Sequence, residues 1–149
     1  MESVETNSVE NVVQFHKTRK RKKISRYLCR VETVGDKWNA YYIESTDELD
    51  IDAPIDSVVS GDCIYPQNDE YGNLLYAIRE LLEWIVPSSQ YSQKQIRILS
   101  QNPYVSTFVN EWSRTTRWRE DDRVPYGEYA KILESYRRDN CEITAFTHF

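Results

Sequence analysis

One segment, residues 96–112, constrains the fold of this chain more than any other, because a strand pattern passes directly into a helix pattern there. Apolar residues alternate over 96–99, and after a polar turn they recur every three or four residues over 104–112. Asn102 followed by Pro103 is typical of a helix start, since asparagine caps the first turn and proline fits its first position. We therefore expect a buried strand that leads directly into an amphipathic helix, which continues to about residue 115.

The remaining pattern predicts further elements on both sides of this segment. Strands are expected over 25–33, 38–44, 56–65 and 141–149, and helices over 70–86 and 126–138. In the first strand, Tyr27, Cys29 and Val31 share one face. The predicted order is β-β-β-α-β-α-α-β, which favours an α/β fold with a mixed sheet: three antiparallel strands followed by parallel strands that are joined through helices.

Length and cysteine content limit the classes of protein to which this chain can belong. The 149 residues are enough for one domain, and we expect a disordered basic arm over 1–23 followed by one folded domain over 24–149. The three cysteines lie far apart, and no apolar signal or membrane segment is apparent, which predicts a soluble intracellular protein. Cys63 and Cys141 have no histidine at zinc spacing, and the acidic segment 45–56 lacks calcium-loop spacing, so no metal and no cofactor is expected.

Charge divides the chain into a basic arm and an acidic body. Residues 1–26 carry a net charge of +4, whereas 27–149 hold 12 basic and 21 acidic residues, a net charge of −9. The basic residues are concentrated in one run, formed by Lys17, Arg19, Lys20, Arg21, Lys22 and Lys23. Such a run is typical of a nuclear-import signal, which would place the protein in the nucleus, or of contact with a phosphate backbone. A solvated, disordered flank is the third interpretation.

The element order and several local motifs resemble the ribonuclease H-like superfamily. The family's strand end T-D-S-x-Y-V corresponds to residues 100–105, and its N-x-x-x-E-L-x-A-I helix is similar to residues 68–82. The resemblance covers about residues 24–148. It implies a mixed five-stranded sheet with helices on its faces, without the family's final helix, and a relation to a retroviral or retroelement connection or ribonuclease H domain.

The same resemblance implies that the family's chemistry is lost. Its hydrolysis uses carboxylates that hold two magnesium ions, and here two of the carboxylate positions fall on Asn73 and Gln101. The first-strand carboxylate falls near Val31, and the closest acid, Glu32, should point to the opposite face of the strand. His148 near the end has no recognisable catalytic partners. We therefore expect no enzyme activity.

The resulting hypothesis is a non-catalytic binding or assembly module that acts through protein–protein contacts, including contacts with a second copy. Possible interface residues are Trp38, Tyr42, Trp112, Arg114, Arg117, Trp118 and Arg119. Two alternatives stay open. One is a nucleic-acid-binding protein that uses the basic arm and the arginine and tryptophan residues of 112–119. The other is a divergent metal-dependent nuclease that uses substitute acids such as Glu32, Asp69 and Glu70.

Overall fold

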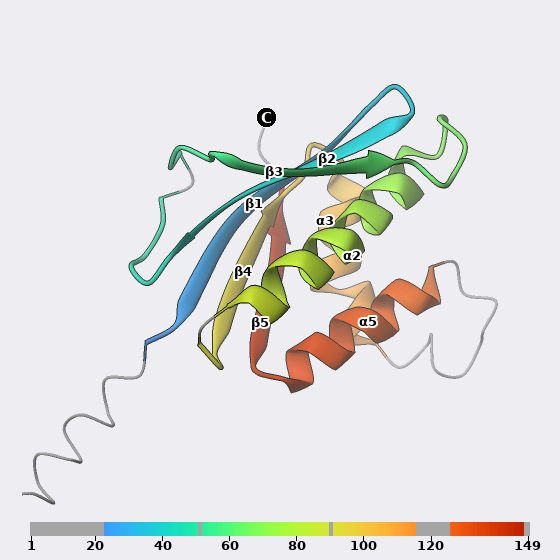
Figure 1. Ribbon diagram of the computed structural model, residues 1–149. Coiled ribbons are helices and arrows are strands. Elements are labelled where there is room, and N and C mark those ends of the chain that lie inside the picture. Colours follow the sequence, from blue (N-terminus) through green and yellow to red (C-terminus); the bar gives the residue numbers. More distant parts are fainter. Residues whose placement is uncertain (1–22, 51, 90, 116–125, 148–149) are drawn as a thin grey trace, which may run out of the picture.

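The protein forms one mixed five-stranded sheet with helices packed against it (Figure 1). The computed structural model describes residues 23–50, 52–89, 91–115 and 126–147. The strands are β1 (Ser25–Val34), β2 (Lys37–Ser45), β3 (Ser57–Asp62), β4 (Lys94–Leu99) and β5 (Cys141–Phe146). The helices are α2 (Glu70–Ser88), α3 (Pro103–Asn110) and α5 (Gly127–Arg138), with a 3₁₀ turn, η1 (Trp112–Arg114), after α3.

The strand order β3-β2-β1-β4-β5 places β1 at the centre of the sheet. β1 pairs antiparallel with β2, and β2 pairs antiparallel with β3, whereas β4 pairs parallel with both β1 and β5. The tight turn between β1 and β2 contains Gly35 at φ +63°, a conformation that glycine adopts without strain. This topology confirms the predicted arrangement of three antiparallel strands followed by parallel strands.

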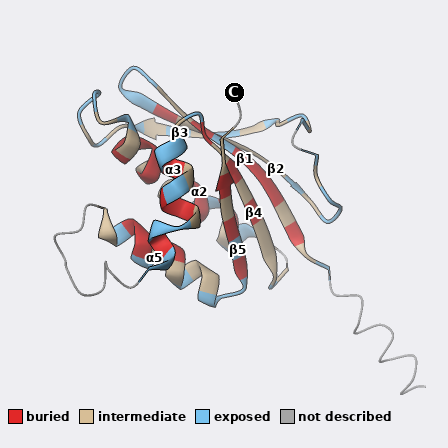
Figure 2. Cartoon of the chain, turned by 180° about the vertical axis from the view of Figure 1, so that it is seen from behind, coloured by how far each residue is buried: buried red, intermediate tan, exposed pale blue. Residues whose placement is uncertain are grey.

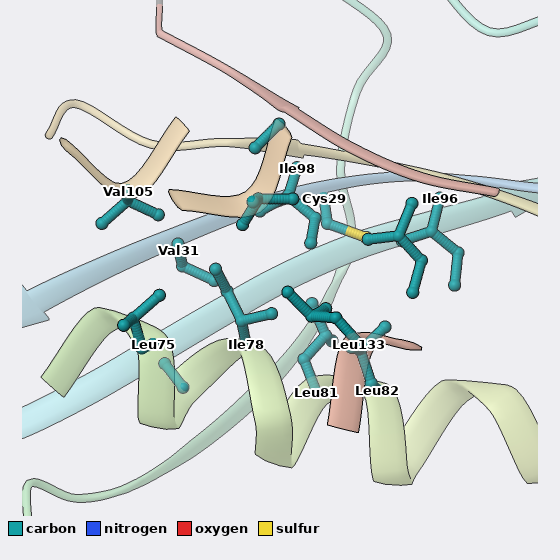
Figure 3. Packing of buried hydrophobic residues seen from close by; sticks show 14 of the residues in the cluster. Cys29, Val31, Leu75, Ile78, Leu81, Leu82, Ile96, Ile98, Val105 and Leu133 are labelled. Atoms are coloured by element: carbon teal, nitrogen blue, oxygen red, sulfur yellow. The ribbon is translucent and has the colours of Figure 1, made fainter. Parts of the chain in front are cut away.

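A single hydrophobic core lies between the sheet and the three helices. Buried and less buried residues alternate along the strands (Figure 2), and Tyr27, Cys29 and Val31 all face the core, as predicted. α2 contributes the largest share, and Ile78, Leu81 and Leu82 point toward strand residues and Leu133 of α5 (Figure 3). This burial stabilises the fold, because each large apolar side chain removed from water contributes about 2 kcal/mol.

The opposite face of the sheet is covered differently. In the described part of the chain all three helices lie on one face, whereas the resemblance implied helices on the faces of the sheet. The acidic segment after β2 crosses the helix-free face, where Arg97 Nη1 donates a hydrogen bond to the Leu49 carbonyl at 3.5 Å. Two arginines of this face stack on aromatic rings: Arg30 on Tyr41 and Arg97 on Phe146.

Two helix boundaries differ from the predicted ones. The helix expected to continue to about residue 115 ends at Asn110 and passes through Glu111 into η1, because the backbone of Glu111 leaves the α region at φ −122°. α2 continues one residue beyond Pro87, where we expected it to stop. Proline there removes only one backbone donor close to the end of the helix, so the last turn still forms. None of the described helices combines the length and the apolar character that crossing a bilayer requires.

Gly61 shows why a small residue is needed on β3. It pairs with Trp38 of β2, and a β-carbon at position 61 would lie 2.8 Å from the indole ring. We therefore expect Gly61→Ala to lower the free energy of unfolding by about 1–2 kcal/mol, because the buried ring would have to shift. Urea unfolding compared with Ser57→Ala, which adds no atoms, would measure the effect, and equal stability of the two variants would contradict it.

Candidate functional site

The region where the family keeps its catalytic carboxylates lies between the carboxyl ends of β1 and β4 and the first turns of α2. Asn73 of α2 is here, and its side chain is only 1% exposed. Its Oδ1 accepts a hydrogen bond from the Tyr65 N–H at 2.9 Å, while its Nδ2 donates to the carbonyls of Tyr65 at 3.3 Å and Pro66 at 3.2 Å. The amide therefore fastens the segment after β3 onto α2, a role that needs both a donor and an acceptor.

The turn after β4 is also built from amide and hydroxyl groups. Gln101 is exposed at its tip, between the buried Ser100 and Asn102. Asn102 caps α3, because its Oδ1 accepts from the Tyr104 N–H at 2.9 Å, and its Nδ2 donates to Glu70 Oε1 at 3.0 Å. The side chains of this turn therefore organise the start of α3 and connect it to the start of α2.

The central strand carries no acid on the core face at the expected position. Val31 is buried in the core, and Glu32 points to the helix-free face, as its place in the alternation predicts. There Glu32 Oε2 accepts hydrogen bonds from the Tyr41 hydroxyl at 2.9 Å and from Asn39 Nδ2 at 3.2 Å. The two remaining substitute acids are engaged elsewhere: Asp69 caps α2 through the Gly72 N–H, and Glu70 binds Asn102.

These residues do not fit the pair of divalent ions that ribonuclease H chemistry uses. Such ions need several carboxylate oxygens that converge on one point, whereas the positions that the sequence resemblance matches to the carboxylates hold an amide, a second amide and a valine. Glu32 lies on the other face of the sheet from Asp69 and Glu70. Within the described ranges no group of three histidine, cysteine or acidic residues could hold a metal ion. No step of metal-assisted hydrolysis can therefore be derived from these side chains.

A cluster of tyrosines occupies the space beside this region. The Tyr126 hydroxyl donates to Asp69 Oδ2 at 2.7 Å, and the Tyr65 and Tyr129 hydroxyls lie 2.7 Å apart. The Tyr126 ring packs edge-on against Tyr71 and Tyr65. Desolvation, followed by the bond to Asp69, raises the pKa of Tyr126 to about 12, and burial raises the pKa of Tyr71 to about 12. The cluster therefore joins α5 to α2 through neutral hydroxyls.

This cluster predicts a loss of stability in alkali. An unfolded tyrosine has a pKa of about 10, so the folded state holds its protons more tightly than the unfolded state does. The contribution of these tyrosines to the free energy of unfolding should be constant below about pH 10 and should decrease as the pH rises toward about 12. Tyr71→Phe with Tyr126→Phe should reduce that slope, which urea unfolding at several pH values would measure. An unchanged slope in the double variant would contradict this assignment.

An apolar hollow of about 500 Å³ opens beside the same region, between α2 and α3. Its lining is mainly aromatic and consists of Tyr71, Tyr104, Thr107, Phe108 and Trp112. Tyr104 is 73% exposed and Trp112 is 46% exposed, which is unusual for side chains of this size. Sequence reasoning selected Trp112 but not Tyr104, although the spacing of four residues places Tyr104 and Phe108 on one side of α3, and Trp112 follows at the start of η1.

The other predicted interface residues lie in different environments. Trp38 is 3% exposed and packs in the core, so the structure removes it from the candidate surface. Tyr42 packs against the core, and its hydroxyl accepts a hydrogen bond from the exposed Trp84 at 2.9 Å. Arg114 donates to the Asn110 and Ile143 carbonyls.

Several predicted residues cannot be placed in this way. Arg117, Trp118, Arg119 and His148 lie outside the described residues. So does the basic arm up to Lys22, whereas Lys23 is described and exposed.

Comparisons with known proteins address the fold. A foamy viral protease-reverse transcriptase (dRH), solved in complex with double-stranded DNA, matches with a TM-score of 0.51 and 11% identity over 97% of this chain. LC9-RNase H1, a type 1 RNase H with the type 2 active-site motif, matches with a TM-score of 0.49, 10% identity and 85% coverage of this chain. RNase H1 from the archaeon Halobacterium salinarum matches with a TM-score of 0.40, 12% identity and 84% coverage. The chain has the ribonuclease H-like fold.

The comparisons show the fold alone, because a sequence identity near 11% carries no information about activity. The chain spans 25% of the length of the foamy viral chain, 64% of LC9-RNase H1 and 86% of the Halobacterium enzyme. No protein-family model matches the sequence, and no curated protein does. The predicted relation to this fold is therefore confirmed, and the activity has to be argued from the residues of this chain.

Proposed function

We propose that this chain is a non-catalytic module with a ribonuclease H-like fold that works by binding other protein chains. The observation that carries this proposal is the bonding of Asn73. The amide uses both of its polar atoms to hold the backbone at 65–66, and a carboxylate in its place would face two carbonyl oxygens. This bonding supports a structural role for the amide rather than the role of a metal ligand.

The aromatic hollow supports the binding part of the proposal. Exposed tyrosine and tryptophan side chains around a concave apolar surface are the residues that dominate protein interfaces. Two acidic residues are chain neighbours of residues that line the hollow: Glu70 precedes Tyr71, and the exposed Glu111 precedes Trp112. This combination favours a partner segment that inserts an apolar side chain and carries basic residues beside it.

The basic run Lys17–Lys23 is proposed to direct the protein to the nucleus. Charge-neutralising changes at Lys20 to Lys23 separate this role from phosphate contact. Loss of nuclear import with unchanged protein binding supports a targeting arm. A flatter dependence of nucleic-acid affinity on salt would support phosphate contact instead, because each neutralised phosphate contributes to that slope.

A metal titration tests the non-catalytic part. Mn²⁺ added to the isotope-labelled full chain broadens the NMR signals of amides near any binding site. We expect no selective broadening of the amides of Asn73 and residues 100–102 at about 1 mM Mn²⁺. This concentration is above the dissociation constant that we expect for a carboxylate-rich two-metal site. Saturable broadening at these amides, removed by Glu70→Gln, would overturn the proposal.

A further inference from the structure

The two edge strands of the sheet differ in their backbone hydrogen bonding. At the β5 edge, side chains of neighbouring elements form hydrogen bonds with the backbone. Asn110 of α3 forms two hydrogen bonds with Ala145. Its Oδ1 accepts one from the Ala145 N–H at 2.9 Å, and its Nδ2 donates the other to the Ala145 carbonyl. The Ile143 carbonyl accepts hydrogen bonds from Arg137 at 2.9 Å and from Arg114 at 3.4 Å. These bonds occupy the outward Ile143 carbonyl and both backbone groups of Ala145, which hinders another strand from adding along this half of β5.

The edge at β3 presents its backbone to the outside. Cys63 N–H donates to the Asp36 carbonyl at 2.8 Å, so Cys63 forms a hydrogen-bonded pair with β2. Because bonded and non-bonded pairs alternate along antiparallel strands, the backbone groups of Val58, Ser60 and Asp62 point away from β2. Among the described residues, no hydrogen bond reaches these outward groups.

The residues of β3 do not discourage pairing. Protected edges commonly carry lysine, proline or a bulge, and the stretch Ser57–Gly61 has no charged residue and no proline and pairs with β2 in regular register. Val58, in the middle of this edge, is 55% exposed. An open edge with an exposed β-branched residue is a surface suited to another strand.

We propose that the strand which completes this edge is β3 of a second copy of this chain, antiparallel to the first about a two-fold axis. An antiparallel strand pair is self-complementary, so one sequence supplies both sides of the contact. The inference adds a second copy of the chain to the partners of the protein-binding role proposed above, through a surface separate from the aromatic hollow, and it rests on that role. It does not depend on whether the carboxylate positions bind metal.

Strand overlap and charge together select the register of this pair. Outward groups must meet outward groups, so Ser60 faces its own copy, Val58 of the copy or Asp62 of the copy. The register with Asp62 would pair only residues 60–62 of each six-residue β3, whereas the other two pair five residues. The second choice would put Asp56 opposite Asp62, and like charges facing each other destabilise a strand pair. In the first choice Ser60 lies at the axis, and Val58 faces Asp62 of the copy, whose carboxylate pairs with Lys37 of its own chain. The structure therefore favours the register centred on Ser60.

Cysteine crosslinking of the full chain tests both the contact and its register. Residues that form a hydrogen-bonded antiparallel pair have Cα atoms about 5.5 Å apart, within the range of a disulfide. The native Cys63 directly follows β3 and is partly exposed, so both cysteine variants are made in a Cys63→Ser background. Ser60→Cys should then yield a disulfide-linked dimer under mild oxidation, at least tenfold more than the Cys63→Ser chain, whose remaining Cys29 and Cys141 are buried. Val58→Cys is the matched control, because its two copies would be four residues out of register. Equal crosslinking of the two variants would overturn the proposed register.

Sedimentation measures the contact without added cysteines. A pair of six-residue strands buries less than the about 1,200 Å² of stable interfaces, so we expect a dimer with a Kd on the order of 10–100 µM. Ser60→Pro removes an outward N–H and should raise that Kd at least tenfold, whereas Ser60→Ala keeps the N–H and should not. Both variants should retain the unfolding midpoint. A monomer mass at all concentrations up to about ten times this Kd would overturn the dimer, and metal binding in the manganese titration would leave it standing.

Discussion

Replacing Asn73 with aspartate should lower the free energy of unfolding by about 3 kcal/mol near neutral pH. The substitution changes few atoms, but it puts a buried carboxylate in front of the Tyr65 and Pro66 carbonyl oxygens, to which the amide now donates. Two acceptors lose their donor, and a buried charge whose one remaining donor among these groups is the Tyr65 N–H has to be desolvated. The loss should shrink as the pH falls toward about 4, because protonation removes the charge.

Urea unfolding at pH 7 and pH 4 measures this effect. Asn102→Asp is the matched control: an aspartate keeps the cap of α3 by accepting from the Tyr104 N–H, and it loses only an exposed hydrogen bond to Glu70, where solvent screens the like charges. We expect that control to cost less than about 1 kcal/mol. A stable Asn73→Asp variant would mean that the position accommodates a carboxylate, and the structural role assigned to the amide would be wrong.

Replacing Arg137 with alanine should cost about 2–3 kcal/mol. Its guanidinium group joins three elements, because it donates to Ser113 Oγ at 2.8 Å, to the Val109 carbonyl at 2.8 Å and to the Ile143 carbonyl at 2.9 Å. Burial, with the nearby Arg114 charge, lowers the pKa of Arg137 to about 10, which still leaves the group charged at neutral pH. Its removal leaves partly buried carbonyl groups without a charged donor.

The matched control for this prediction is Arg138→Ala, one residue further along α5. Arg138 pairs only with Glu134 on the surface, and exposed pairs of this kind contribute about 0.3–0.5 kcal/mol. Chemical unfolding of the two variants should therefore separate them by at least about 1.5 kcal/mol. Similar stabilities would show that the bonds between α5 and β5 contribute little.

The order of elements could be predicted because it depends on local periodicity. Alternation over β1 and helical spacing over α2 each reflect one face that has to be buried, and both are visible in the sequence. The position of Glu32 on the opposite face from Val31 followed from the same alternation. The break at Glu111 was missed, because the apolar spacing continues to Trp112 although the backbone leaves the helix.

The hydrogen bonds that support the proposed structural role of Asn73 could not be predicted from the sequence, because they join segments that are distant along it. Gln101 and Asn73 were recognised as neutral at carboxylate positions, but the bonds from Asn73 to the backbone at 65–66 depend on how the loop after β3 folds back onto α2. Asn110 looked like a polar residue on a helix surface, and only the packing of α3 beside β5 reveals that its side chain closes a sheet edge. The burial of Trp38 likewise depends on its pairing with Gly61.

The central claim, that this ribonuclease H-like fold does not hydrolyse nucleic acid, is tested most directly by incubating the full chain with a labelled RNA–DNA hybrid. Duplex and single-stranded substrates should be included, each with Mg²⁺ or Mn²⁺. The account predicts that every substrate remains intact with either metal at protein concentrations in excess of substrate. Cleavage of the hybrid that disappears in the Glu70→Gln variant would contradict it, since the chain would then possess a metal-dependent site built from other acids.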